Sequence, residues 1–124
     1  FRGQDANGAH VLLARPADWT GGLVVHVHGG PRMTPPQPNT SDEDVLRFAE
    51  FLREGWAMAA TSRRRAGFAT GRAVEDTENA RRLAVETLGQ PRMTVLHGQS
   101  WGGAVAAKAI ETANEPGPDG RRPW

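Results

Sequence analysis

Residues 94–111, TVLHGQSWGGAVAAKAIE, join an apolar run to a helix-like segment of small residues through a turn that carries a serine. The apolar run has the composition of a buried strand, and alanine dominates the segment after the turn. Gly98 and Gly102 stand two residues either side of Ser100. Because glycine has no Cβ, this spacing lets the backbone turn sharply and lift the serine hydroxyl clear of the sheet. The stretch predicts a strand, a tight turn and a helix, with Ser100 as a candidate nucleophile.

A second turn rich in glycine follows an earlier apolar run. Residues 23–28, LVVHVH, have the pattern of a buried strand, and the sequence HGGP at 28–31 ends it. The amides of Gly29 and Gly30 are unshielded, and the first amide of the helix after the serine belongs to Trp101. We predict that Trp101 and Gly29 or Gly30 form an oxyanion hole. The alternative is a plain turn in which glycine and proline only end the strand.

Apolar runs and helical patterns alternate along the chain. We predict strands over 9–15, 23–28, 56–61 and 93–97, and helices over 42–54, 74–88 and 101–113. This order predicts a three-layer α/β/α fold with a mostly parallel sheet. Ser41 is expected to cap the first helix, and Glu75 with Asp76 to complement the dipole in the first turn of the second. Residues 114–124 lack periodicity and are expected to form an irregular tail. No strand follows 93–97, so one sheet edge is expected to lie open.

The composition of the chain excludes several classes of site and partner but does not identify a function. The 124 residues suit one small domain, and a net charge of +1 gives no argument for a nucleic-acid partner. The absence of cysteine excludes disulfides and thiolate metal sites, and no run approaches the roughly 18 apolar residues of a membrane span. His26 and His28 have no nearby cysteine or paired carboxylate, so we expect no metal and no cofactor. The sequence makes no prediction of localisation.

HGGP at 28–31 and GQSWGG at 98–103 together resemble the α/β-hydrolase superfamily, over about residues 9–113. The pattern is similar to esterases and to proline iminopeptidases, and HGGP also recurs among prolyl-oligopeptidase relatives. The resemblance implies that Ser100 is the nucleophile and that Trp101 with Gly29 or Gly30 supplies the oxyanion donors. It also implies that the predicted strands from 23–28 onward are family strands 3, 4 and 5, with 9–15 an earlier antiparallel strand.

The chain departs from this family in its catalytic triad. The family order is serine, then an acid, then a histidine, each after a later strand. Beyond Ser100 the chain has no histidine, and its carboxylates lie in the last helix or the tail: Glu111, Glu115 and Asp119. The four upstream histidines are expected to be structural: His10, His26, His28 and His97. We therefore expect residues 1–124 to be the N-terminal portion of a single hydrolase domain, a partial fold that ends after the helix following Ser100. A missing C-terminal half or another chain would complete the sheet and the triad.

The leading functional hypothesis is a serine hydrolase that cleaves carboxylic esters through an acyl-enzyme on Ser100, with the 124-residue chain alone inactive. A serine aminopeptidase or oligopeptidase of the same fold is the enzymatic alternative, although residues 62–71 match the proline-iminopeptidase segment poorly. The third possibility is a truncated, non-catalytic piece that acts in binding or assembly. Arg63-Arg64-Arg65 is either a solvated loop or an anion site for a carboxylate-bearing substrate, with Arg64 the residue to test.

Overall fold

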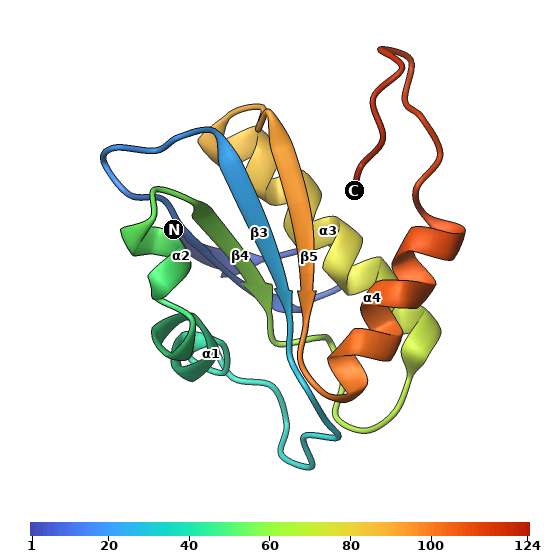
Figure 1. Cartoon of the computed structure of the whole chain (residues 1–124). Coiled ribbons are helices and arrows are strands. Elements are labelled where there is room, and N and C mark those ends of the chain that lie inside the picture. Colours follow the sequence, from blue (N-terminus) through green and yellow to red (C-terminus); the bar gives the residue numbers. More distant parts are fainter.

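A mixed sheet of five strands in the order β1-β2-β4-β3-β5 forms the centre of the computed structural model, which describes residues 1–124 (Figure 1). The strands are β1 (Arg2–Gln4), β2 (His10–Ala14), β3 (Gly22–Val27), β4 (Ala57–Thr61) and β5 (Met93–Gly98). The helices are α1 (Asp42–Arg47), α2 (Glu50–Arg53), α3 (Thr70–Leu88) and α4 (Trp101–Thr112). β3 pairs in parallel with both β4 and β5, whereas β2 pairs antiparallel with β1 and β4. The predicted α/β fold class is confirmed, including the antiparallel strand before the parallel ones.

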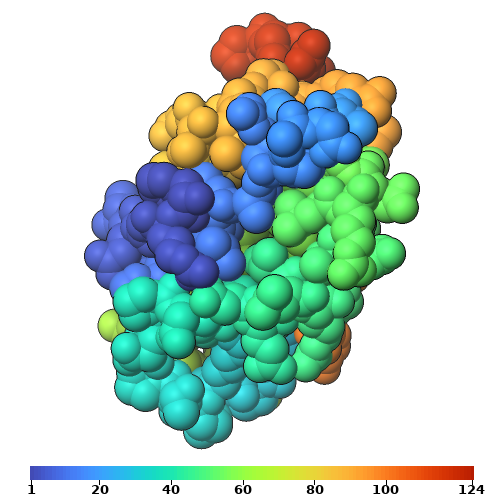
Figure 2. Space-filling model, turned by 90° about the vertical axis from the view of Figure 1, so that its left-hand side faces the viewer, coloured from blue at the N-terminus to red at the C-terminus, as the bar shows by residue number.

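Helices cover both faces of the sheet and make the three predicted layers. α3 and α4 lie on one face, and α1 with α2 lies on the other (Figure 1). Figure 2 shows the side on which the 31–41 loop and the short helices α1 and α2 gather, in cyan to green. Alternate residues of β3 point to opposite faces, so Val25 belongs to the cluster under α3 and Val24 to the cluster under α1. No helix of the chain is both long enough and apolar enough to cross a bilayer.

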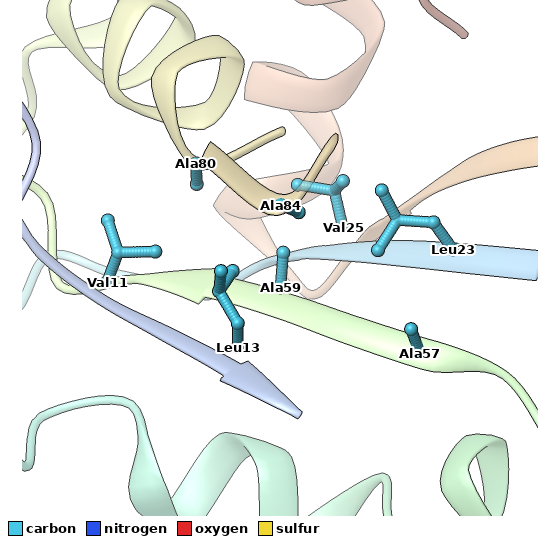
Figure 3. Close-up of a cluster of buried hydrophobic side chains, with 8 residues drawn as sticks. All are labelled: Val11, Leu13, Leu23, Val25, Ala57, Ala59, Ala80 and Ala84. Carbon is cyan, nitrogen blue, oxygen red and sulfur yellow. The ribbon is translucent and has the colours of Figure 1, made fainter. Parts of the chain in front are cut away.

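The core between the sheet and α3 is built largely from small side chains (Figure 3). Ala80 and Ala84 of α3 face Ala57 and Ala59 of β4, and all four are buried. Alanine lets a helix approach a sheet closely, and larger valine and leucine side chains fill the remaining space from the neighbouring strands. The cluster contains Val11, Leu13, Leu23, Val25, Ala57, Ala59, Ala80 and Ala84. This close packing fixes β3 and β4, whose ends carry the loops of the candidate site.

The first predicted helix is interrupted in the structure. Phe48 leaves the helical region at φ −109° and ψ 25°, and it separates α1 from α2. Its ring packs against His26 at 4.9 Å and against His97 at 4.5 Å between ring centroids. Aromatic packing on the sheet therefore prevails over the helical pattern. Ser41 is buried and makes no side-chain capping bond, so the predicted cap is also wrong.

Other parts of the chain also differ from the prediction, or add to it. α3 begins at Thr70, four residues early, because Ala73 of its first turn is buried against α4. The polar segment Arg2–Gln4 forms an unpredicted edge strand on β2. Residues 114–124 contain no helix or strand, but Trp124 folds back and packs against the core. At the other edge, β5 pairs only with β3 and leaves its second edge open, as expected.

Candidate active site

Ser100 occupies the turn between β5 and α4 with an unusual backbone conformation. Its φ of 52° and ψ of −126° place it among only two non-glycine residues with positive φ. An L-residue in such a conformation is strained by about 1–3 kcal/mol, and this strain is typical of functional sites. The side chain is exposed, and its hydroxyl makes no hydrogen bond within the chain. The turn therefore presents a free hydroxyl at the end of the sheet.

The flanking glycines make this turn possible. A Cβ on Gly98 would lie 2.6 Å from the carbonyl oxygen of Gly102. A Cβ on Gly102 would collide with the carbonyl oxygens of Val27 and His28 at the end of β3. Real Cβ atoms do not approach backbone atoms so closely, so only glycine fits at either position. The turn is thereby pressed against the loop that follows β3.

The HGGP loop lies directly beside this turn. A Cβ on Gly29 would be 3.2 Å from both the Gln99 carbonyl oxygen and the Ser100 Cβ. A Cβ on Gly30 would be 3.1 Å from the Trp101 ring. The amides of Gly29 and Gly30 donate no hydrogen bond within the chain, and Trp101 is the first residue of α4, whose amide has no partner inside the helix. The structure thus brings the four predicted site residues together.

A depression of about 320 Å³ opens beside Ser100 on the side of α1. Its lining holds no hydrophobic residue and consists of Gly29, Gly30, Pro31, Arg32, Glu43, Asp44, Arg47, Gln99 and Ser100. The charges are paired: Arg32 contacts Asp44 at 2.6 Å, and Arg47 contacts Glu43 at 2.9 Å. Burial acts to raise the pKa of Asp44, but His26 and Arg32 together hold it below its usual value. A larger depression of about 380 Å³ lies at the opposite end of β5, around Met93 and the tail, away from Ser100.

None of the four histidines forms a hydrogen bond to Ser100. His26 and His97 lie side by side on neighbouring strands, with their Nδ1 atoms 3.0 Å apart. His28 is buried and donates from Nδ1 to the carbonyl oxygen of Gly29. His10 lies in β2, on the other side of β4 from the serine's strand. No group of three or more histidines and carboxylates is placed to hold a metal ion.

The burial of His28 predicts that the protein loses stability in mild acid. Burial, and then the charge of Arg63, lower the pKa of His28 from 6.5 to about 4. The unfolded chain takes up this proton below pH 6.5, whereas the folded chain takes it up only near pH 4. Protons therefore favour the unfolded state between these values, and the free energy of unfolding falls by up to about 3 kcal/mol as the pH drops across them, at roughly 1.4 kcal/mol per pH unit.

Urea unfolding at several pH values between 7 and 4 measures this loss, with His28→Asn as the comparison. The asparagine amide keeps a donor for Gly29 but does not titrate, so the pH dependence should flatten. A smaller slope should remain from His97, whose pKa burial also lowers. An unchanged slope in the variant would contradict the assignment to His28.

Two of the three arginines after β4 are engaged in contacts within the chain, whereas Arg65 is exposed. Arg64 donates to Asp76 and Glu75, with contacts of 2.6 Å and 2.8 Å. These bonds raise the pKa of Arg64 and occupy its guanidinium, so the structure does not support it as a free anion site. Asp76 is 1% exposed, and both Glu75 and Asp76 lie beyond the first turn of α3, so they are ion-pair partners and not the predicted dipole complements. An aspartate three residues after the buried Ala73 and four before the buried Ala80 lies on the buried face of the helix, which was a sequence signal for a charged partner.

Arg63 is the contact residue that the sequence did not reveal. It is 4% exposed and donates from Nη2 to the carbonyl oxygen of His28. Its Cζ lies over the Trp101 ring, 4.6 Å from the ring centroid. Its backbone has a positive φ of 61°. Nothing in the run of three arginines distinguishes this side chain from its neighbours, because its burial depends on loops that meet only in the folded chain.

Comparisons with known proteins agree with this geometry at the level of the fold. No family model matches the sequence, and a search among curated proteins finds no relative. Three solved structures cover 90–92% of this chain at 18% identity: a thermostable carboxyl esterase from Bacillus coagulans (TM-score 0.66), a hormone-sensitive lipase from a metagenome library (0.65) and an alpha-beta serine hydrolase homologue from Coxiella burnetii (0.64). The chain spans 39%, 38% and 57% of their respective lengths. The chain therefore has part of the α/β-hydrolase fold.

Proposed function

We propose that this chain carries the nucleophile and the oxyanion hole of a serine hydrolase that cleaves carboxylic esters through an acyl-enzyme. The observation that carries the proposal is the strained, exposed Ser100 beside the unpaired amides of Gly29 and Gly30. A serine held in this way costs stability and serves no packing purpose, whereas a nucleophile requires it. The likeness to a carboxyl esterase and a lipase supports ester hydrolysis over other reactions of the fold.

In the proposed mechanism, the Ser100 hydroxyl oxygen attacks the acyl carbon as a general base removes its proton. The negative charge that develops on the carbonyl oxygen is stabilised by the amides of Trp101 and of Gly29 or Gly30. The protonated base then gives its proton to the departing alcohol, which leaves the acyl group on the serine. Water, activated by the same base, attacks the acyl-enzyme and releases the acid. The substrate is a small-molecule ester, and no cofactor takes part.

The general base and its acid are proposed to come from outside these 124 residues. The support is geometric. His26 and His97 pair with each other through their Nδ1 atoms, and His28 donates its Nδ1 hydrogen to the carbonyl oxygen of Gly29. Strands added in parallel at the open edge of β5 would end beside Ser100, because parallel strands present their C-terminal ends at one edge of a sheet. The remainder of the protein or a second chain would supply those strands and complete the site.

A serine aminopeptidase or oligopeptidase is the second candidate, favoured by the combination of HGGP with a serine followed by tryptophan and glycine. The two candidates differ in the bond they cleave. Parallel assays with p-nitrophenyl esters and with aminoacyl anilides separate them, and we expect turnover of the esters. Turnover of the anilides alone would favour the peptidase.

The test of the proposal is covalent labelling of the protein expressed from its complete reading frame. A fluorophosphonate reacts with an activated serine, and mass spectrometry of the digested product should find the label on Ser100. The 124-residue chain by itself is expected to hydrolyse no ester, because it lacks the base. A label on another serine would overturn the assignment. Ester turnover by the 124 residues alone would show that one of the four histidines acts as the base.

A further inference from the structure

Arg63, just after the end of β4, combines a strained backbone with a buried side chain. Its amide donates to Thr61 Oγ1 at 3.1 Å, and its carbonyl oxygen accepts from Ser62 Oγ at 2.9 Å. Two hydroxyl groups thus fix a residue whose φ of 61° is strained. The guanidinium Nε is buried without any hydrogen-bond partner. An orphaned buried donor costs about 1–3 kcal/mol, and such costs concentrate at functional sites.

The guanidinium of Arg63 contacts both sides of the candidate oxyanion hole. Nη2 donates to the carbonyl oxygen of His28, at the start of the glycine loop. A Cβ built on Gly30 would lie 3.4 Å from Nη1, so the guanidinium also borders the second glycine. Its Cζ lies over the indole of Trp101, 4.6 Å from the ring centroid. One side chain therefore joins the loop after β3 to the first residue of α4.

These contacts set the direction of the loop amides. In a trans peptide the C=O and the next N–H point in opposite directions within one plane. When Arg63 holds the carbonyl of His28, it therefore aims the amide of Gly29 to the opposite side. In the same way, His28 Nδ1 holds the carbonyl of Gly29 and aims the amide of Gly30. Both amides remain free of partners within the chain.

We infer that Arg63 is a positioning residue of the oxyanion hole: it orients the Gly29 amide through the His28 carbonyl and holds Trp101 through its ring. The inference rests on the proposed function, because the hole matters only if Ser100 is acylated. Lysine would replace arginine only in part, since an ammonium keeps the positive charge but offers no fork of donors. Burial lowers the pKa of Arg63 only to about 10, so the side chain keeps its charge at neutral pH.

The experiment compares Arg63→Met and Arg63→Lys with wild type and with Arg53→Met in the complete protein. Arg53 is the matched control, because it is exposed on α2 and pairs only with Glu50. Fluorophosphonate labelling gives the rate of phosphonylation separately from the affinity for the probe. Deleting an oxyanion donor outright slows enzymes by about 100- to 1,000-fold. We expect Arg63→Met, which misaligns a donor, to react about 10- to 100-fold more slowly at similar affinity, with Arg63→Lys between it and wild type.

A second readout does not depend on catalysis. In ¹H–¹⁵N spectra, the amides of Gly29 and Gly30 and the indole of Trp101 should shift in Arg63→Met and stay in place in Arg53→Met. A folded Arg63→Met that labels at the wild-type rate would overturn the inference, and so would unmoved Gly29 and Gly30 amides. If the wild-type protein is not labelled, the proposed function is wrong. In that case the spectra still test the positioning role: it is retained if the Gly29 and Gly30 amides shift in Arg63→Met, and it is overturned if they do not. Should Arg63→Met not fold, Arg63→Lys is judged by the same two readouts.

Discussion

Replacing Ser100 with alanine is expected to abolish both ester hydrolysis and fluorophosphonate labelling, with a loss of at least about 10,000-fold in kcat. The substitution removes the hydroxyl oxygen that is the proposed nucleophile, and no other side chain at the turn offers another nucleophile. The overall fold should persist, because the hydroxyl makes no hydrogen bond within the chain. Circular dichroism confirms the fold, and steady-state assays with p-nitrophenyl esters measure the loss. Residual turnover near the wild-type rate would remove Ser100 from the mechanism.

A glycine at the same position separates strain from chemistry. Ser100→Gly should be as inactive as Ser100→Ala but more stable than wild type by about 1 kcal/mol, because glycine adopts a φ of 52° without steric cost. Part of that gain is offset by the larger entropy of glycine in the unfolded chain. Urea unfolding of the two variants measures the difference. If Ser100→Gly is less stable than Ser100→Ala, the turn is not strained at this residue.

The sequence predicted the parts of the site that depend on local backbone requirements. Gly98 and Gly102 mark a close approach of two backbones, and the glycine pair at 29–30 marks a second one. Such signals survive in a single sequence because a Cβ would collide with backbone atoms at Gly98 and Gly102 and would make tight contacts at Gly29 and Gly30. The parallel order of β3, β4 and β5 followed from the alternation of apolar runs with helical segments. These are the features on which the superfamily resemblance also rests.

The features that the sequence failed to reveal depend on contacts between distant segments. The break after α1 arises because Phe48 packs on His26 and His97, which lie on β3 and β5, one before and one after it in the sequence. Edge strand β1 is polar and short, so it carries no apolar pattern, and its pairing with β2 alone makes it a strand. The same holds for Arg63, whose partners lie in the loop after β3 and at the start of α4, one before it and one after it in sequence. Local sequence patterns contain no information about contacts between segments that are distant in the sequence.

The close approach between the serine turn and β3 leads to the second large effect. Gly102→Ala is expected to lower the free energy of unfolding by about 4 kcal/mol and to abolish labelling of Ser100. Its Cβ would collide with the carbonyl oxygen of Val27, a backbone atom at the C-terminal end of β3 that cannot easily move aside, because β3 pairs with strands on both of its sides. Relief requires α4 to withdraw from β3, which would also carry the Trp101 amide away from the Gly29 loop.

The neighbouring glycine provides a matched control for this prediction. A Cβ on Gly103 would lie 3.9 Å from the carbonyl oxygen of Gly98, an ordinary van der Waals contact. Gly103→Ala should therefore be tolerated, and it should stabilise α4 by roughly 0.5–1 kcal/mol, the usual gain from alanine over glycine inside a helix. Urea unfolding and labelling of both variants measure the contrast. Equal effects at Gly102 and Gly103 would mean that helix propensity, and not contact with β3, governs the turn. Destabilisation by Gly102→Ala together with stabilisation by Gly103→Ala would show that the contact between α4 and β3 holds the strained serine beside the oxyanion loop.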